Sequence, residues 1–183
     1  MLRILNAVDE ETIDRLFAVY RQSMEDLSGR FEDGRIMRRE YARFLAEFIR
    51  EPGRLAAVEE EQGRWASALR AIETAPGAWF LEALETDPEL RGRGHARRLL
   101  NNVAEYVSRR GGRQLACLIR RTNQASIAAH RACGFQPTDK APVNWDGEPD
   151  EESVRFECDL TCGKGGDGDA SDHEGPGTSG SQL

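Results

Sequence analysis

The most informative stretch of the chain is Thr86-Asp-Pro-Glu-Leu-Arg-Gly-Arg-Gly-His-Ala96, which joins a predicted strand to a predicted helix. Upstream, WFLEALET (79–86) has the composition of a strand, and downstream the apolar residues of 94–110 recur at helical spacing. Gly92 and Gly94 allow the backbone to approach a ligand closely. The free N–H groups and positive dipole end of a helix start suit a phosphate. We therefore predict a phosphate-binding loop at residues 91–96.

Two common phosphate-binding motifs do not fit this loop. The chain has no Gly-Lys-Ser/Thr sequence here, so the loop is not a Walker P-loop. It also lacks the GxGxxG pattern followed by a ribose-binding acid that marks dinucleotide-binding folds. The glycines alone leave one alternative open, a helix start with solvated arginines at positions 91, 93, 97 and 98.

Outward from the loop, apolar periodicity predicts helices before and after a group of strands. The spacing from Ile13 to Leu27 predicts one helix with Asp9 as N-cap, and Tyr41–Ile49 predicts a second that ends at Pro52 and Gly53. Turn residues then separate short apolar runs, which predicts an antiparallel meander. The remaining elements are expected as strands at 55–60, 65–73, 79–86, 114–119 and 154–160, and as helices at 94–110 and 124–133.

Length and composition indicate one folded domain with an appendage. Of 183 residues, 39% are hydrophobic, enough for one core, and no apolar run is long enough for a membrane span. Residues 163–183 are rich in Gly, Ser and Asp, so we expect a domain at 1–162 and a disordered acidic tail at 163–183. We expect no membrane contact, a cytoplasmic location, reduced cysteines and no bound metal, since no Cys/His spacing fits zinc.

Two segments resemble motifs of the GCN5-related N-acetyltransferases, the GNAT superfamily. LETDPELRGRGHARRLL (84–100) is similar to motif A, [RQ]-x-x-G-x-[GA], and NQASIAAHRACGF (123–135) is similar to motif B. The two occur in the expected order and on the expected elements. The matching positions are Arg91, Gly94 and Ala96 in motif A, and Asn123, Ser126, His130, Gly134 and Phe135 in motif B.

The resemblance implies a fold and a co-substrate. The fold class is α/β (an α+β sandwich), with a mixed, mostly antiparallel central sheet, splayed fourth and fifth strands, and helices on both faces. Acetyl-CoA would lie between the splayed strands 79–86 and 114–119. Its pyrophosphate would rest on backbone N–H groups of the loop, its pantetheine arm would pair with β-strand backbone, and one amide would polarise the acetyl carbonyl. The implied cofactor-binding residues are Leu84, Glu85, Thr86, Arg91, Gly92, Arg93, Gly94, His95, Ala96 and Asn123.

The implied chemistry is direct transfer of acetyl from the thioester to an amine. His130 stands where the family usually has a tyrosine, and it is the predicted proton donor to the leaving thiolate, provided its surroundings keep it charged. Glu82 is the predicted base. Glu85 is three residues away, so on a regular strand the two carboxylates would lie on opposite faces and only one would reach the substrate. A water-relayed base is the alternative.

The acceptor is expected to be a small-molecule or peptide amine, and acid-rich segments at 25–35 and 144–153 favour a cationic one. Solvated loop charges are the simpler explanation of those segments. A homodimer is included among the expected partners. Two rival functions stay open: a catalytically weak, acyl-CoA-binding sensor or scaffold, and a nucleic-acid-binding protein that uses RGRGHARR and SRRGGR. The net charge of −7 argues against nucleic acid as a partner.

Overall fold

A computed structural model describes residues 1–31 and 33–161, so the expected tail at 163–183 lies outside the described residues. Seven strands form one sheet in the order β1-β2-β3-β4-β5-β7-β6. The helices are α1 (Glu10–Val19), α2 (Arg21–Ser28), α3 (Gly34–Phe48), α4 (His95–Ser108) and α5 (Gln124–Arg131), with a 3₁₀ turn η1 (Pro88–Leu90). The strands are β1 (Leu2–Ile4), β2 (Arg54–Glu61), β3 (Arg64–Ala75), β4 (Ala78–Thr86), β5 (Gln114–Arg120), β6 (Gln136–Pro137) and β7 (Ser153–Asp159).

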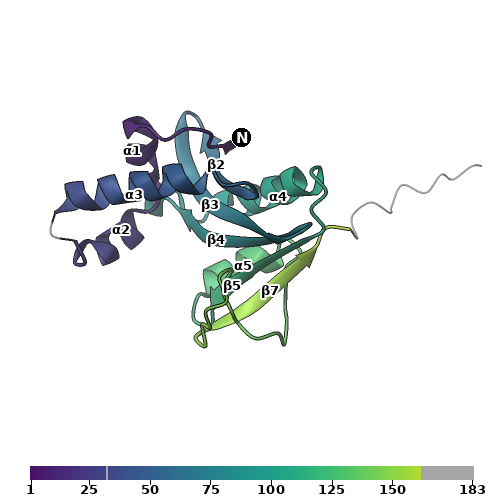
Figure 1. Cartoon of the computed structure of the whole chain (residues 1–183). Helices are drawn as coiled ribbons and strands as arrows, with labels where there is room; N and C mark the ends of the chain where they lie inside the picture. The colour runs from purple at the N-terminus through teal and green to yellow at the C-terminus, as the bar shows by residue number, and fades with distance from the viewer. Residues whose placement is uncertain (32, 162–183) are drawn as a thin grey trace, which may run out of the picture.

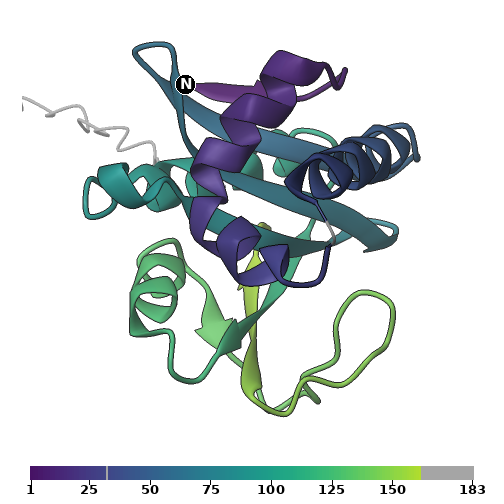
Figure 2. The same ribbon diagram turned by 90° about the vertical axis from the view of Figure 1, so that its left-hand side faces the viewer.

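Helices cover both faces of the sheet, as expected. Figures 1 and 2 show α1, α2 and α3 on one face of β2–β4 and α4 on the other, with α5 beside β5. Each face has its own apolar core. Leu99, Leu100 and Val103 of α4 pack on Leu69 and Leu81 of the sheet. On the opposite face, side chains of α1–α3 pack on alternate residues of β2 and β3, namely Ile13, Leu16, Val19, Met37 and Leu45 against Ala56, Val58 and Ala68.

One predicted helix is divided into two helices in the structure. The periodicity from Ile13 to Leu27 predicts a continuous helix, but α1 ends at Val19 and α2 begins at Arg21. Tyr20 lies between them with φ −91° and ψ 17°, outside the helical region. It is still buried with Leu16 and Met24, so the apolar spacing continues across the break and conceals it. The N-cap prediction is confirmed, because the Asp9 side chain accepts from the backbone N–H of Thr12 at 2.8 Å.

Strand β4 is central, yet only part of it is paired with β5. The β4–β5 ladder is parallel and runs from Ala78↔Gln114 to Leu81↔Cys117, after which β4 continues to Thr86 and β5 to Arg120. Burial changes at the same point. Trp79, Phe80 and Leu81 are buried, whereas 82–86 are half-buried. The second half of a central strand is therefore open on the side that β5 leaves (Figure 1).

A β-bulge in β4 overturns the expectation that Glu82 and Glu85 lie on opposite faces. Glu82 pairs with Arg70 of β3 and Glu85 pairs with Ala68, so three residue steps on β4 oppose two on β3. Arg70 and Ala68 lie on one face of β3 because they are two residues apart. Glu82 and Glu85 consequently share that face, the one covered by α1–α3. Ala83 takes up the extra residue with φ +51°.

Candidate active site

The loop between β4 and α4 is exposed and shaped by its glycines. Gly92 and Gly94 have φ of +77° and +80°, and a side chain at Gly92 would meet no atom within 4 Å. Gly94 is the N-cap of the 14-residue helix α4 and contributes no side-chain hydrogen bond to it. The first N–H groups of α4 therefore have no side-chain cap. Asp87, which is 1% exposed, anchors the other end of the loop by accepting from Arg64 at 2.7 Å.

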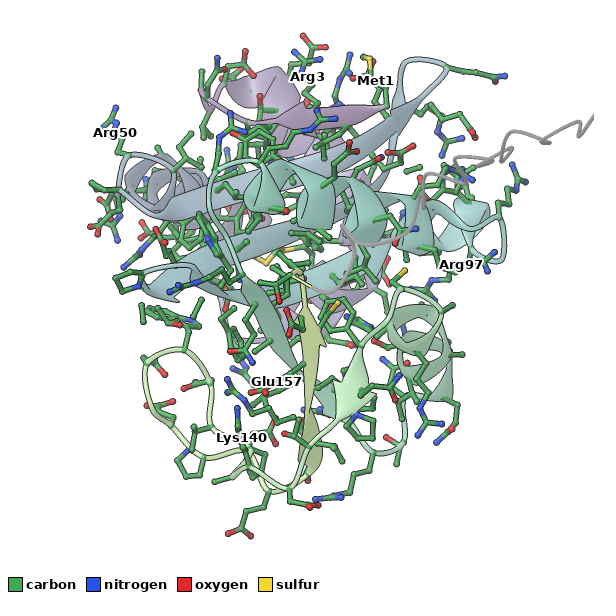
Figure 3. The ribbon with its side chains drawn as sticks, turned by 90° about the vertical axis from the view of Figure 1, so that its right-hand side faces the viewer. Met1, Arg3, Arg50, Arg97, Lys140 and Glu157 are labelled. Carbon is green, nitrogen blue, oxygen red and sulfur yellow. The ribbon has the colours of Figure 1, made fainter. Side chains whose placement is uncertain are left out.

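Positive charge surrounds this loop, but the four arginines are not equivalent. Arg91 donates to Gln22 of α2 at 2.9 Å, and Arg98 donates to the Arg93 carbonyl at 3.1 Å and to Glu61 at 3.3 Å. Arg93 and Arg97 are exposed, and Figure 3 shows Arg97 extending from the first turn of α4. Arg91 and Arg98 thus tie the loop to α2 and β2, whereas Arg93 and Arg97 extend into solvent.

His95 is the first residue of α4 and points inward. It is 1% exposed, and its Nδ1 lies 2.7 Å from an Arg98 guanidinium nitrogen, which can only donate. The hydrogen is therefore on Nε2, which finds no hydrogen-bond partner among the described residues, with Glu61 Oε2 at 3.5 Å. Burial lowers the pKa of His95, and the charge of Arg98 lowers it further. Only its backbone N–H is available to a ligand in the loop.

The open half of β4 adjoins this loop. Ala83 and Leu84 have no partner residue in either neighbouring strand of the described sheet. Leu84 directs its side chain into the core beneath α4, so its backbone can serve a ligand while its side chain does not. Thr86, at the end of the strand, has its hydroxyl 3.2 Å from Ser67 of β3.

Helix α5 brings the motif B residues beside the start of α4. Cys133, just after α5, has its Sγ 3.6 Å from the carbonyl oxygen of Arg97. Asn123 caps α5, with Oδ1 accepting from the Ser126 N–H at 3.0 Å. Its Nδ2 amide group is the part of the side chain that can donate to a ligand.

His130 lies on α5 and is 3% exposed. Its Nδ1 is 2.8 Å from the Ser126 carbonyl oxygen, which can only accept, so Nδ1 carries a hydrogen. Its ring packs edge-on against Phe135, with centroids 5.1 Å apart. Burial lowers the pKa of His130 despite the opposing effect of the Ser126 hydrogen bond. These surroundings favour the neutral imidazole. The predicted role of His130 as proton donor requires surroundings that keep the ring charged, and these do not.

The two carboxylates on β4 have different partners. Glu82 accepts from Arg70 Nε at 2.8 Å through Oε1 and from Trp145 Nε1 at 3.0 Å through Oε2. Glu85 accepts a hydrogen bond from the Ser23 hydroxyl of α2. Burial raises the pKa of Glu85 and outweighs the Ser23 hydrogen bond and the Arg91 charge, which lower it, while Asp26 raises it further.

Sequence reasoning missed Arg70 and Trp145. Arg70 lies within the apolar run WASALRAIE (65–73), and a lone cation in a buried strand was the available signal for a buried ion pair. Trp145 belongs to the segment between β6 and β7 and reaches β4 across 63 residues of sequence, which no local pattern reveals. The same segment is tied to β7 through Lys140 and Glu157, 2.7 Å apart, which Figure 3 shows side by side.

Metal ligation and cysteine chemistry are not indicated by the described part of the chain. No group of three or more His, Cys, Asp or Glu within 1–31 and 33–161 could hold a metal ion. Cys117, Cys133 and Cys158 are free, and burial raises the pKa of each, to about 12 for Cys117, so none is an activated nucleophile. None of the described helices is long and apolar enough to cross a membrane.

Residues 16–135, well over half of the chain, match the model of the acetyltransferase (GNAT) family, and the chain belongs to that family. An aminoglycoside N(6′)-acetyltransferase type 1 from Stenotrophomonas maltophilia is 39% identical over 72 residues, which are 39% of this chain and 46% of that protein. The match thus spans less than half of that relative.

Solved structures share the fold at low identity. A spermidine N-acetyltransferase from Vibrio cholerae, crystallised with CoA and spermine, has a TM-score of 0.67 and 15% identity, covering 88% of this chain and 95% of that one. The ribosomal-protein-S18-alanine N-acetyltransferase from Escherichia coli has a TM-score of 0.60 and 16% identity, covering 87% and 94%. The expected α/β fold class, with a mixed, mostly antiparallel sheet and helices on both faces, is confirmed.

Proposed function

We propose that this protein is an acetyl-CoA-dependent N-acetyltransferase. The observation that carries the proposal is the open half of β4, where Ala83 and Leu84 are unpaired on both sides, directly before an uncovered glycine loop at a helix start. An extended ligand with a phosphate group can add to such an edge as a strand would and end on the helix N-terminus. Acetyl-CoA has both parts, and it supplies an activated thioester for transfer to an amine.

In this proposal each part of the site binds one part of the co-substrate. The pyrophosphate is held by the backbone N–H groups of the loop from Arg91 to Ala96, which include those of Gly92, Arg93, Gly94 and His95. Backbone groups of Leu84 and Thr86 pair with the extended arm, and Asn123 donates through Nδ2. An amide N–H at Leu84 or Glu85 faces the acetyl carbonyl and stabilises the oxyanion that forms on attack.

His130 remains the proposed proton donor to the leaving thiolate, with a restriction. Because Nδ1–H is bonded to the Ser126 carbonyl, donation must come from Nε2 of the imidazolium, which burial disfavours. A second candidate function follows from that observation, an acyl-CoA-binding module with little or no turnover. Release of CoA in the presence of an amine distinguishes the transferase from the binding module.

The acceptor in this proposal is an amine on a small molecule or a peptide. The relatives described above are named for aminoglycoside, spermidine and ribosomal-protein alanine acceptors, which gives a panel of one 6′-amino aminoglycoside, spermidine and a peptide with N-terminal alanine. Release of CoA thiol with any of them, absent without the amine, supports the transferase. Tight acetyl-CoA binding with no thiol release across the panel supports the binding module.

Co-substrate binding is tested first by thermal unfolding with acetyl-CoA, NAD or ATP. Acetyl-CoA at 100 times its Kd stabilises by about 2.7 kcal/mol, whereas NAD and ATP should leave Tm unchanged. Gly94→Asp should abolish the shift, since aspartate tolerates a positive φ but places negative charge in the loop. Gly63→Asp is the control, because Gly63 has a similar positive φ, +78°, no atom within 4 Å of an added Cβ, and a place in the β2–β3 turn, away from the loop. A full shift in Gly94→Asp would refute the loop assignment.

A further inference from the structure

The bulge at Ala83 gives this strand two carboxylates on one face where a regular strand would give one. Glu82 and Glu85 both act electrostatically on Tyr20 and on Tyr41, which lie in the layer formed by α1–α3. Either carboxylate could therefore meet an acceptor amine that enters between that layer and β4. Their hydrogen-bond partners distinguish them.

The charge of the Glu82 carboxylate is already paired with that of a cation. One oxygen accepts from Arg70 and the other from Trp145, and the side chains of Glu82 and Arg70 are only 22% and 17% exposed. The Arg70 guanidinium is itself enclosed, 4.9 Å from the Phe44 ring. Both carboxylate oxygens of Glu82 are therefore engaged, and an amine would have to displace one of these hydrogen bonds to reach it. Through these two hydrogen bonds Glu82 connects β4 to β3 and to Trp145.

Glu85 has the opposite character. It is half-buried and accepts from the neutral Ser23 hydroxyl. Burial raises its pKa, which brings a carboxylate toward the range of an effective base. It also follows directly after Leu84, the unpaired residue whose backbone lies along the open edge of the sheet. A proton acceptor is needed at that point, since a primary amine is mostly protonated at neutral pH.

We propose that Glu85, and not Glu82, takes the proton from the acceptor amine, directly or through one water, and that Glu82 is a positioning residue. This inference rests on the proposed function. In the balanced step the substrate ammonium gives one proton to the Glu85 carboxylate, and the freed nitrogen lone pair forms the C–N bond to the acetyl carbon. The thioester C–S bond breaks and its electron pair leaves on sulfur, which takes the Nε2 proton of His130. The second nitrogen proton then restores the His130 imidazolium.

The test compares pH profiles of kcat/KM for Glu85→Gln and Glu82→Gln with the amine of the panel that the wild-type chain acetylates fastest. We expect Glu85→Gln to lose about 10²–10⁴-fold of kcat/KM and the acidic limb of the profile. Glutamine keeps the size of the side chain and can still accept from Ser23, so the fold and acetyl-CoA binding should persist, as unfolding curves will verify. Glu85→Asp should restore the limb with part of the rate.

Glu82→Gln should keep the limb and lose stability instead, because it leaves Arg70 without its counter-charge. If that variant does not fold, the double variant Arg70→Gln/Glu82→Gln replaces the ion pair with two amides and answers the same question.

Ser23→Ala adds an independent readout. The Ser23 hydrogen bond lowers the pKa of Glu85, so its loss should move the acidic limb to higher pH. The groups that face Glu85 and could titrate or shift with it are Asp26 of α2, Arg91 of the loop, and Tyr20 and Tyr41 of the helical layer. None of these has an ordinary pKa between about 5 and 8, so a limb in that range that moves in Ser23→Ala belongs to Glu85.

The outcomes separate this assignment from the proposed function. A limb that survives in Glu85→Gln and disappears in Glu82→Gln, or in the double variant, overturns the assignment and leaves the transferase intact. Wild-type protein that binds acetyl-CoA and releases no CoA with any amine overturns the transferase, and the assignment with it.

Discussion

Replacement of His95 by leucine should stabilise the protein, although His95 is the first residue of the proposed phosphate-binding helix. The side chain is fully enclosed, and its Nε2–H has no hydrogen-bond partner among the described residues. A buried polar group left unsatisfied costs about 1–3 kcal/mol. The leucine variant gives up the Nδ1 contact with Arg98, whose side chain is 43% exposed and keeps Glu61 as a partner.

The net gain should be about 1 kcal/mol at pH 7.5, or about 2–4 °C in Tm for a chain of this size. The gain should grow as pH falls. The pKa of His95 is lowered in the folded state, so below about 6.5 protons bind to the unfolded chain first and wild-type stability is lost, whereas leucine takes up none.

Urea unfolding followed by tryptophan fluorescence at pH 7.5 and 5.5 measures both effects. His130 titrates in both proteins, so its contribution cancels in the difference between them. A leucine variant that is less stable than wild type at pH 7.5, or a difference that is the same at both pH values, would refute the reasoning.

Three further predictions concern packing, charge and catalysis. Gly112→Ala should cost about 1–3 kcal/mol in urea unfolding, because the new Cβ would lie 2.2 Å from Val107 Cγ1; a change under about 0.5 kcal/mol would contradict it. Arg70→Gln should cost about 3–5 kcal/mol by leaving Glu82 enclosed without its cation, and a double-mutant cycle with Glu82→Gln should recover part of that loss. His130→Phe should lower kcat far more than acetyl-CoA affinity if the ring donates a proton; equal losses measured by steady-state kinetics and by titration would make it a packing residue.

The strands of the meander were predictable because turn residues mark their ends. EQGR and TAPG separate the apolar runs, and β2, β3 and β4 lie at the expected positions. Strands β1 and β6 have three and two residues, too few to show a period, and were missed as strands. The break at Tyr20 was missed for a different reason: its side chain occupies the buried position that a continuous helix would require.

The strand–loop–helix order around 91–96 and the helix of motif B were predictable because local spacing determines them, whereas the face and the partners of each carboxylate were not. Assigning Glu82 and Glu85 to opposite faces assumed a regular two-residue period, and the bulge at Ala83 depends on how β3 pairs with β4. Alanine at φ +51° carries no sequence signal, since glycine is the residue that marks such positions. The partners of Glu82, Arg70 and Trp145, come from other elements and required the tertiary structure.

The short β4–β5 ladder has a consequence for how the molecule opens. Strands β1–β4 form one antiparallel block and β5, β7 and β6 another, and four residue pairs join them edge to edge. Regions with fewer shared contacts open at lower free energy than the global unfolding transition. We therefore expect the amides of β5 and β7 to exchange hydrogen for deuterium as one cooperative unit, sooner than those of β2 and β3. A ligand that contacts both blocks would slow that exchange to the rate of global unfolding. Binding at the β4–β5 junction would therefore stabilise the whole sheet against local opening.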